Sequence, residues 1–350
     1  MTGIHFVIIA FVVFFGIKIL NRIFNNEKGE TASQFRYRSV KYRKLSFDDS
    51  AIAWCANLLS VDKTVLEKIL YTHISLMYNR FKIKKRSGGF RNIAHPNKTL
   101  MSIQKTIYGR ILSQVNIHPA ATGFRKGMSI VNNVKSHLGK DDIIKTDIVN
   151  FFSSIQQDRV TKTFENIGYP TNISNVLSEL CCLDGHLPQG APTSPALSNI
   201  IAYEMDKKLA FLSHKYGMEY TRYADDLTFS GYNINPEFIL PEIRKAVNGE
   251  SFALKKAKTR YINKNKRKII TGISISSGTK LTIPKAKKRE IRKNVYFILT
   301  KGLAEHQKFI QSADPVYLKR LICYLSFWNM VEPDNKYVSD SIISLKKLQT

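Results

Sequence analysis

The tetrapeptide Tyr223-Ala224-Asp225-Asp226 places two adjacent carboxylates between two short runs that have the composition of β-strands. Residues 220–223 precede the acids and residues 227–230 follow them, and both runs are rich in Tyr, Thr and Phe, which favour strands. We therefore predict a β-hairpin with Asp225 and Asp226 at its tip. An Asp-Asp pair taken alone is more often a solvated turn than a metal site.

A third carboxylate comes from the apolar, β-branched run 143–149, Ile-Ile-Lys-Thr-Asp-Ile-Val. This pattern predicts a buried central strand with Asp147 near its end. Phosphoryl transfer would explain three converging acids, because two cations about 3.5 to 4 Å apart activate the attacking oxygen and stabilise the leaving one. Mg²⁺ prefers oxygen ligands. Asp147, Asp225 and Asp226 are thus candidate ligands of two Mg²⁺ ions.

A loop and helix are predicted from Leu-Pro-Gln-Gly-Ala-Pro-Thr-Ser-Pro at 187–195. Ser194 and Pro195 form a good N-cap and first-turn pair for a helix over 196–212. Gly190 would let the backbone approach a ligand closely, and Gln189 would offer an amide to a base or sugar. A purely structural turn before a helix is the alternative.

A basic hairpin is predicted over 81–93, with Ser-Gly-Gly at its bend. Its cations would lie over a triphosphate, with Arg91 as a planar, bidentate clamp and Lys84 or Lys85 as a point charge. A solvated basic hairpin without a ligand is the alternative interpretation.

The order of these parts resembles the fingers and palm motifs of reverse transcriptases. The resemblance covers residues 66–283 and rests on the basic hairpin, the acid of Thr146-Asp147-Ile148-Val149-Asn150-Phe151-Phe152, the Leu187-Pro188-Gln189-Gly190 loop and Tyr223-Ala224-Asp225-Asp226. Each motif is weak alone, whereas four in the right order are specific.

Two shorter elements narrow the resemblance to bacterial retron reverse transcriptases. Asn133-Val134-Lys135-Ser136-His137 is similar to their Asn-Ala-x-x-His element, with Val in place of Ala. Ile270-Thr271-Gly272 is similar to their Val-Thr-Gly element, with Ile in place of Val. Both replacements are conservative in size and character.

The resemblance implies a role for each matching residue. Asp147, Asp225 and Asp226 are the implied catalytic carboxylates, and Asp147, Asp225 and the carbonyl of Ile148 are the implied direct Mg²⁺ ligands. Phe152 lies five residues after Asp147, at the position whose ring blocks a ribose 2′-hydroxyl and so favours deoxynucleotides.

The resemblance also implies the rest of the nucleotide pocket. Lys258 would protonate or steady the leaving pyrophosphate, with the lysines at 255 and 256 as alternatives. Gln189 and Gly190 would line the pocket for the template and the incoming deoxynucleoside triphosphate.

The composition agrees with a nucleic-acid partner, because the formal net charge is +27 and the pI is about 9.9. Basic residues cluster between 255 and 293, where Glu290 is the sole acid. This bias predicts a nucleic-acid track, and the alternative is charge spread over exposed faces. The predicted RNA-binding residues are Asn133, His137, Lys285, Lys287, Lys288, Arg289 and Arg292.

The N-terminus predicts a separate hydrophobic helix over 1–24. Residues 4–17 are apolar apart from His5, and with Lys18 snorkelling the stretch reaches the roughly 20 residues that cross a bilayer. The cations that follow would leave the remaining chain in the cytoplasm, anchored to the inner membrane by a single span. A helix that docks a protein partner or lies in the membrane interface is the alternative.

These features predict an α+β chain with a right-hand polymerase fold. Residues 25–46 would form a basic linker, 47–145 mostly helical fingers, 146–283 a palm with an antiparallel sheet, and 284–350 a helical thumb that grips duplex or structured RNA. The length is ample for a hydrophobic core.

The leading hypothesis is an RNA-directed DNA polymerase of retron type. The resemblance implies that it copies part of a structured non-coding RNA from an RNA 2′-hydroxyl, leaving single-stranded DNA joined to RNA (msDNA), and serves antiphage defence with an effector protein. One alternative is an abortive-infection-type reverse transcriptase that makes untemplated DNA. The other is a membrane-bound RNA-binding scaffold or toxin with a vestigial polymerase site.

Overall fold

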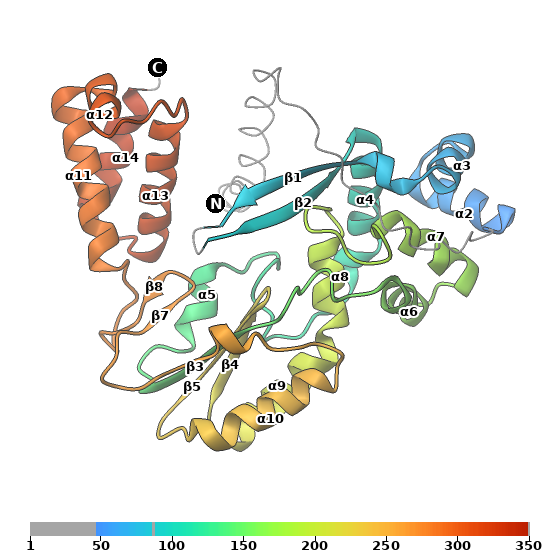
Figure 1. The fold of residues 1–350 in the computed structure, drawn as a ribbon, viewed down its shortest axis with the longest axis horizontal. Coiled ribbons are helices and arrows are strands. Elements are labelled where there is room, and N and C mark those ends of the chain that lie inside the picture. The colour runs from blue at the N-terminus through green and yellow to red at the C-terminus, as the bar shows by residue number, and fades with distance from the viewer. Residues whose placement is uncertain (1–46, 86–87, 349–350) are drawn as a thin grey trace. The chain divides into compact units, whose positions relative to one another are not determined.

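The computed structural model describes residues 47–85 and 88–348 (Figure 1). They fall into a larger unit that ends at Leu281 and a smaller unit that begins at Thr282. The predicted hydrophobic helix over 1–24 and the linker over 25–46 lie outside the described residues, so both stay predictions. Within the described part of the chain, we find no helix with the length and apolar character of a membrane span.

The centre of the larger unit is a four-stranded antiparallel sheet in the order β4-β5-β3-β6. Its strands are β3 (Asp142–Asp147), β4 (Glu219–Tyr223), β5 (Asp226–Gly231) and β6 (Arg260–Ile262). Nearly every side chain of β3 is buried, as the apolar run predicted for a central strand. Helix α9 (Tyr203–Lys215) packs on β4, and α10 (Pro236–Asn248) packs on α9 (Figure 1).

A long antiparallel ribbon and a helical layer complete the larger unit. The ribbon consists of β1 (Tyr78–Lys84) and β2 (Phe90–Pro96), which confirms the predicted basic hairpin. Helices α2, α3, α4, α6 and α7 pack around one another and bury Leu66, Ile107 and Phe164. The helices of this layer and its surroundings are α2 (Asp49–Leu59), α3 (Lys63–Tyr71), η1 (Ile74–Met77), α4 (Lys98–Arg110), η2 (Leu112–Gln114), α5 (Ile130–Lys135), α6 (Gln157–Ile167) and α7 (Thr171–Cys181).

The predicted helix over 196–212 is two helices, α8 (Ser194–Ile201) and α9, which meet at Ala202. Thr193 occupies the N-cap position of α8 and makes no side-chain capping bond. The Ser194 hydroxyl instead donates to the Pro188 carbonyl at 2.7 Å. Ser194 therefore closes the preceding loop and is not the predicted N-cap.

A tight hairpin follows the sheet and the short helix η3 (Lys256–Lys258). Its strands are β7 (Ile269–Ile270) and β8 (Ile273–Ser274), joined by Thr271 and Gly272 with φ angles of 44° and 88°. A two-residue turn with both central φ angles positive matches strand twist, which explains the glycine. Most of the retron-like Ile-Thr-Gly element therefore forms a turn.

The smaller unit is a helical bundle of α11 (Lys285–Lys301), α12 (Leu303–Phe309), α13 (Tyr317–Val331) and α14 (Lys336–Lys347) (Figure 1). Pro284 precedes the first helix, as predicted. The core includes Val295, Leu325 and Trp328. The apolar stretch from 317 to 330 supplies α13, the most buried helix face of the bundle.

Candidate active site

The three candidate aspartates come from the ends of two neighbouring strands. Asp147 at the end of β3 is directly opposite Asp226 at the start of β5. Tyr223 pairs with Asp226, so Ala224 and Asp225 form the turn of the predicted hairpin. The Ile148 amide donates to the Asp225 carbonyl at 2.9 Å. The sheet therefore brings together carboxylates that are far apart in the sequence.

The hairpin carboxylates are in an unfavourable environment for negative charge. Burial raises the pKa of Asp225, and the neighbouring Asp226 raises it further, while Arg91 and Lys255 oppose the shift. Burial also raises the pKa of Asp226, against the opposing charge of Lys145. Two partly buried like charges require cationic compensation, and hard carboxylate oxygens are the donors that Mg²⁺ prefers. The donor set therefore fits a divalent cation.

The predicted sharing of a metal by all three aspartates is not formed in this structure. Among residues 47–85 and 88–348, no group of three or more His, Cys, Asp or Glu side chains is close enough together to hold a metal ion. The carboxylate of Asp147 instead forms an ion pair with the Lys258 ammonium. This pair neutralises one carboxylate where like charges would otherwise repel.

The basic ribbon extends toward these acids. Burial lowers the pKa of Lys258, and the charges of Lys85 and Arg91 lower it further, so both cations lie within electrostatic reach of the site. Arg91 pairs with Ile83 across the ribbon, whereas Lys84 pairs with Phe90. Side chains alternate between the faces of a strand, which puts Lys84 on the opposite face from Arg91. The structure thus brings together Lys85 and Arg91, and Lys84 faces away from them.

The Gln189-Gly190 loop lies against strand β2. The Ala94 amide donates to the Gln189 carbonyl at 2.9 Å. Gly190 has φ +132°, and a Cβ added to it would lie 2.6 Å from the Ala94 carbonyl oxygen. The close backbone approach that requires glycine here is to strand β2, and the predicted approach of Gly190 to a ligand stays a prediction. The Gln189 side chain is half-buried, and its proposed contact stays a prediction.

Phe152 belongs to a group of aromatic rings beside the aspartates. Its ring centroid lies 5.6 Å from that of Phe151 and 6.1 Å from that of Phe124. The Phe124 ring centroid also lies 6.5 Å from that of Tyr223, the residue just before the turn formed by Ala224 and Asp225. This turn is called the catalytic turn below. The sequence analysis missed Phe124, although an aromatic residue between Gly123 and Arg125 was a signal for an exposed ring on a turn.

A buried ionic network is hydrogen-bonded to the catalytic turn. The fully buried guanidinium of Arg222 donates to Asn199 Oδ1 at 3.0 Å and to the Ala224 carbonyl at 3.1 Å. Asp206 accepts two bonds from the same guanidinium and one from the Tyr220 hydroxyl. Ala224 has a positive φ of 57°, which is costly for a residue with a Cβ. The network holds that strained turn in place.

The sequence analysis also missed this network. Arg222 is a charged residue in the middle of an otherwise strand-like run, and this position was the sequence signal for a buried ion pair. Its partner Asp206 is in α9, and only the fold brings the two together.

Asn133 and His137 are internal, which contradicts the prediction that their side chains contact RNA. Their exposed fractions are 1% and 0%. The His137 ring bonds Ser230 at 2.7 Å and Thr221 at 2.8 Å. Burial, with a smaller effect from Lys140, lowers the pKa of His137 to about 3. The residue is thus a neutral connector between the α5 region and the sheet.

Asn133 joins the two retron-like elements. Its Oδ1 accepts from the Thr122 hydroxyl at 2.9 Å, and its Nδ2 donates to the Thr271 hydroxyl at 3.4 Å. The Asn-x-x-x-His and Ile-Thr-Gly elements therefore meet in space, and they position the sheet and its turns.

The predicted RNA-binding cations of α11 have different surroundings. Lys288 forms a 2.6 Å ion pair with Glu332 and lies over the Trp328 ring. Lys287 bonds Glu290 and lies over an aromatic ring of α13. Arg292 lies over the rings of Trp328 and Tyr337. These three cations therefore stabilise the bundle.

Lys285 and Arg289 are exposed, and their RNA contacts stay predictions.

Comparison with known proteins agrees with this arrangement. The family described as reverse transcriptase (RNA-dependent DNA polymerase) matches residues 83–292, a range that contains strand β2 of the ribbon, the four-stranded sheet and all three aspartates. The chain therefore belongs to the reverse transcriptase family.

Individual relatives show which type of reverse transcriptase this is. The chain is 31% identical over 280 residues to the retron Ec86 reverse transcriptase of Escherichia coli, covering 77% of this chain and 86% of the relative. It is 27% identical to the retron Ec83 reverse transcriptase of the same species, covering 83% and 98%. The predicted resemblance is confirmed, and the enzyme is an RNA-directed DNA polymerase of the bacterial retron type.

Among solved structures, an apo telomerase from Candida tropicalis aligns with a TM-score of 0.41 and 15% identity. The alignment covers 61% of this chain and 56% of that chain.

Proposed function

We propose that this reverse transcriptase copies part of a structured non-coding RNA into single-stranded DNA, starting from a 2′-hydroxyl of that RNA. The observation that carries the proposal is the register of Asp147 opposite Asp226, with Asp225 in the adjoining turn. Similarity to retron enzymes over most of the chain supports the choice of RNA.

Asp147, Asp225 and Asp226 would hold two divalent cations, for which we propose Mg²⁺, together with the carbonyl of Ile148. When bound, the cations would supply activation of the attacking hydroxyl and stabilisation of the leaving oxygen. Lys258, paired with Asp147 in the free enzyme, would then be released. The Lys258 ammonium pairs with Asp147 and is influenced by the charges of Lys85 and Arg91, which suits it to steady the leaving pyrophosphate.

Lys85 and Arg91 would bind the triphosphate of the incoming deoxynucleotide. The charge of Arg91 acts on both Asp225 and Lys258, which supports a role close to the proposed catalytic residues. Phe152 would lie against the sugar and exclude a 2′-hydroxyl. Gln189 would contact the base or sugar.

In this proposal, residues 47–145 act as fingers, 146–283 as the palm and 284–350 as the thumb. The exposed cations Lys285 and Arg289 on the first bundle helix would contact the backbone of the RNA. We also propose an antiphage role with an effector protein, which rests on the retron resemblance. The proposed N-terminal membrane anchor rests on the sequence of residues 1–24.

The direct test is incorporation of labelled deoxynucleotides by the purified full-length protein with the RNA encoded beside its gene. Asp147→Asn, Asp225→Asn and Asp226→Asn should each reduce incorporation by roughly 100-fold or more. Asp158→Asn is the matched control, because this carboxylate is exposed in the first turn of α6. Equal incorporation by all four variants would refute the assigned site.

The product itself tests the priming mechanism. Digestion of the RNA should leave DNA of template-matched sequence with a ribonucleotide at its 5′ end. Random or homopolymeric DNA would instead support the untemplated alternative. A cellular phenotype that survives the Asp225→Asn/Asp226→Asn double substitution would favour a scaffold or toxin.

A further inference from the structure

Phe124 is an exposed aromatic residue in a strained conformation beside the catalytic turn. Its side chain is 42% exposed, and its φ of 59° lies in the left-handed region. Burial in the core does not account for this conformation, because the residue is exposed to solvent. Residues held in rare backbone conformations cluster at ligand sites.

The loop that carries Phe124 is fixed from two sides. A Cβ on Gly123 would lie 2.8 Å from the amide nitrogen of Ala224, so the two backbones are in direct contact. Asn199 Nδ2 donates to the Gly123 carbonyl at 2.9 Å. Asn199 also accepts from Arg222. The loop is thus connected to the same network as the catalytic turn, and the exposed ring is held in advance of any ligand.

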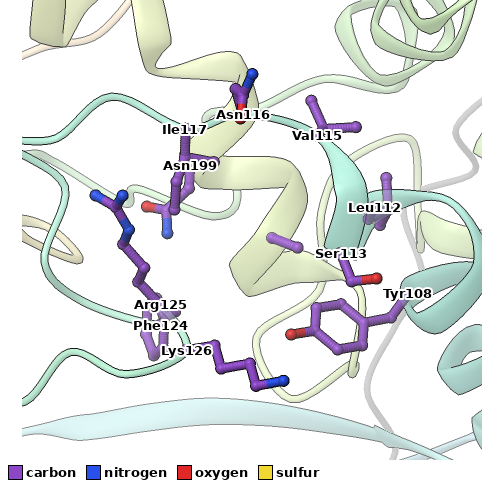
Figure 2. A pocket seen from close by; sticks show the side chains of 11 residues that line it. Tyr108, Leu112, Ser113, Val115, Asn116, Ile117, Phe124, Arg125, Lys126 and Asn199 are labelled. Carbon is purple, nitrogen blue, oxygen red and sulfur yellow. The ribbon is translucent and has the colours of Figure 1, made fainter.

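Beside this ring lies a pocket of about 220 Å³ (Figure 2). Phe124, Arg125 and Lys126 form one wall, and none of the lining residues is acidic. The lining also includes the side chains of Tyr108 and Ser113, which carry hydroxyl groups. An aromatic face, two cations and neutral hydrogen-bonding groups together match the chemistry of a nucleotide.

We propose that this pocket binds an unpaired nucleotide of the RNA template, with its base stacked on Phe124 and its phosphates near Arg125 and Lys126. This inference deepens the proposed function and rests on it. Proteins that hold single strands combine aromatic platforms with basic residues. A duplex offers no free base face to such a ring.

The incoming deoxynucleotide is a poorer occupant of the same pocket. The cations suited to its triphosphate, Lys85 and Arg91, act on Asp225 and Lys258. Arg125 and Lys126 are a separate pair of cations, and both line the pocket together with Phe124. Phe124 thus neighbours Phe152 of the proposed nucleotide site and also lines this pocket, which suits a template strand that must lead into the nucleotide site.

The test compares two primer–template duplexes that differ only in a single-stranded 5′ RNA overhang. Binding to full-length protein is measured by fluorescence anisotropy without deoxynucleotides. Phe124→Ala should weaken binding of the overhang duplex by roughly 10-fold, as expected for loss of one stacked base. Its binding of the flush duplex should stay within about twofold of wild type. Phe124→Tyr, which keeps the ring, is the matched control and should bind both duplexes normally.

Equal weakening for both duplexes, or no weakening for either, would overturn the proposal. A second measurement guards against indirect effects of the substitution. Wild-type protein is crosslinked to an overhang that carries 4-thiouridine, and the crosslinked peptide is mapped. We expect it within residues 108–126, and a crosslink confined to another part of the chain would contradict the assignment. Both readouts are independent of polymerisation, so failure of the catalytic assignment leaves them interpretable.

Discussion

Arg222 and Asp206 form a fully buried two-point ion pair, with Nε–Oδ1 and Nη2–Oδ2 distances of 2.8 and 2.6 Å. The guanidinium also holds the Ala224 carbonyl. A charge pair inside the core therefore fixes the turn that carries Asp225. None of the groups in these bonds is a candidate metal ligand, so we expect the hairpin to be positioned before substrates bind.

Asp206→Asn should destabilise the protein by about 3–5 kcal/mol, because it leaves the Arg222 charge buried without compensation. Glu204→Gln is the control on the same helix, where an exposed pair with Lys207 contributes at most about 1 kcal/mol. Urea denaturation measures both. Similar unfolding free energies for the two variants would show that the buried pair has no special role.

Local patterns predicted the hairpin of the aspartates and the basic ribbon, because strand composition and turn residues act over a few positions. Asp147 was predicted near the end of a buried strand and was expected to converge with the two hairpin acids, whereas its register opposite Asp226 is seen only in the structure. The Arg222–Asp206 pair could not be predicted, since it depends on how α9 packs on β4. The polar residues Asn133 and His137 were misassigned because sequence alone does not distinguish a buried polar connector from an exposed ligand contact.

Gly190→Ala should destabilise the fold through a backbone clash. The added Cβ would lie 2.6 Å from the Ala94 carbonyl oxygen, in a loop that the hydrogen bond from the Ala94 amide to the Gln189 carbonyl ties to β2. Gly168→Ala is a matched control, since Gly168 also has positive φ, +115°, but nothing lies within 4 Å of its Cβ position.

Strain from positive φ alone costs about 1–3 kcal/mol, so Gly168→Ala should show this cost and Gly190→Ala a larger one. Thermal denaturation compares the two variants. Equal losses would mean that the loop relaxes away from β2 and that the clash is not limiting.

Phe152→Ala should admit ribonucleotides. The ring is held against Phe151 and Phe124, so truncation to Ala opens space that neighbouring rings cannot fill without moving. The ratio of kcat/KM for a deoxynucleotide to that for the matching ribonucleotide should fall by roughly 10-fold or more. Phe152→Tyr keeps the bulk and should preserve the ratio. Unchanged selectivity in the Ala variant would assign sugar discrimination to another residue.

His137 makes folding stability sensitive to acid. Burial lowers its pKa from 6.5 to about 3 in the folded state. As the pH falls below 6.5, the histidine of the unfolded chain takes up a proton that the folded protein excludes, so stability is lost. At pH 5 this loss is about 2 kcal/mol relative to neutral pH.

Urea denaturation of wild type and His137→Gln at pH 7 and pH 5 isolates this effect, because the other titrating groups are common to both proteins. The variant should be less stable at pH 7, since a glutamine cannot reproduce both bonds to Ser230 and Thr221. At pH 5 the difference between the two proteins should shrink by about 2 kcal/mol, because only the wild type loses the histidine contribution. A difference that is the same at both pH values would mean that His137 takes up a proton in the folded protein as readily as in the unfolded chain, and would contradict the lowered pKa.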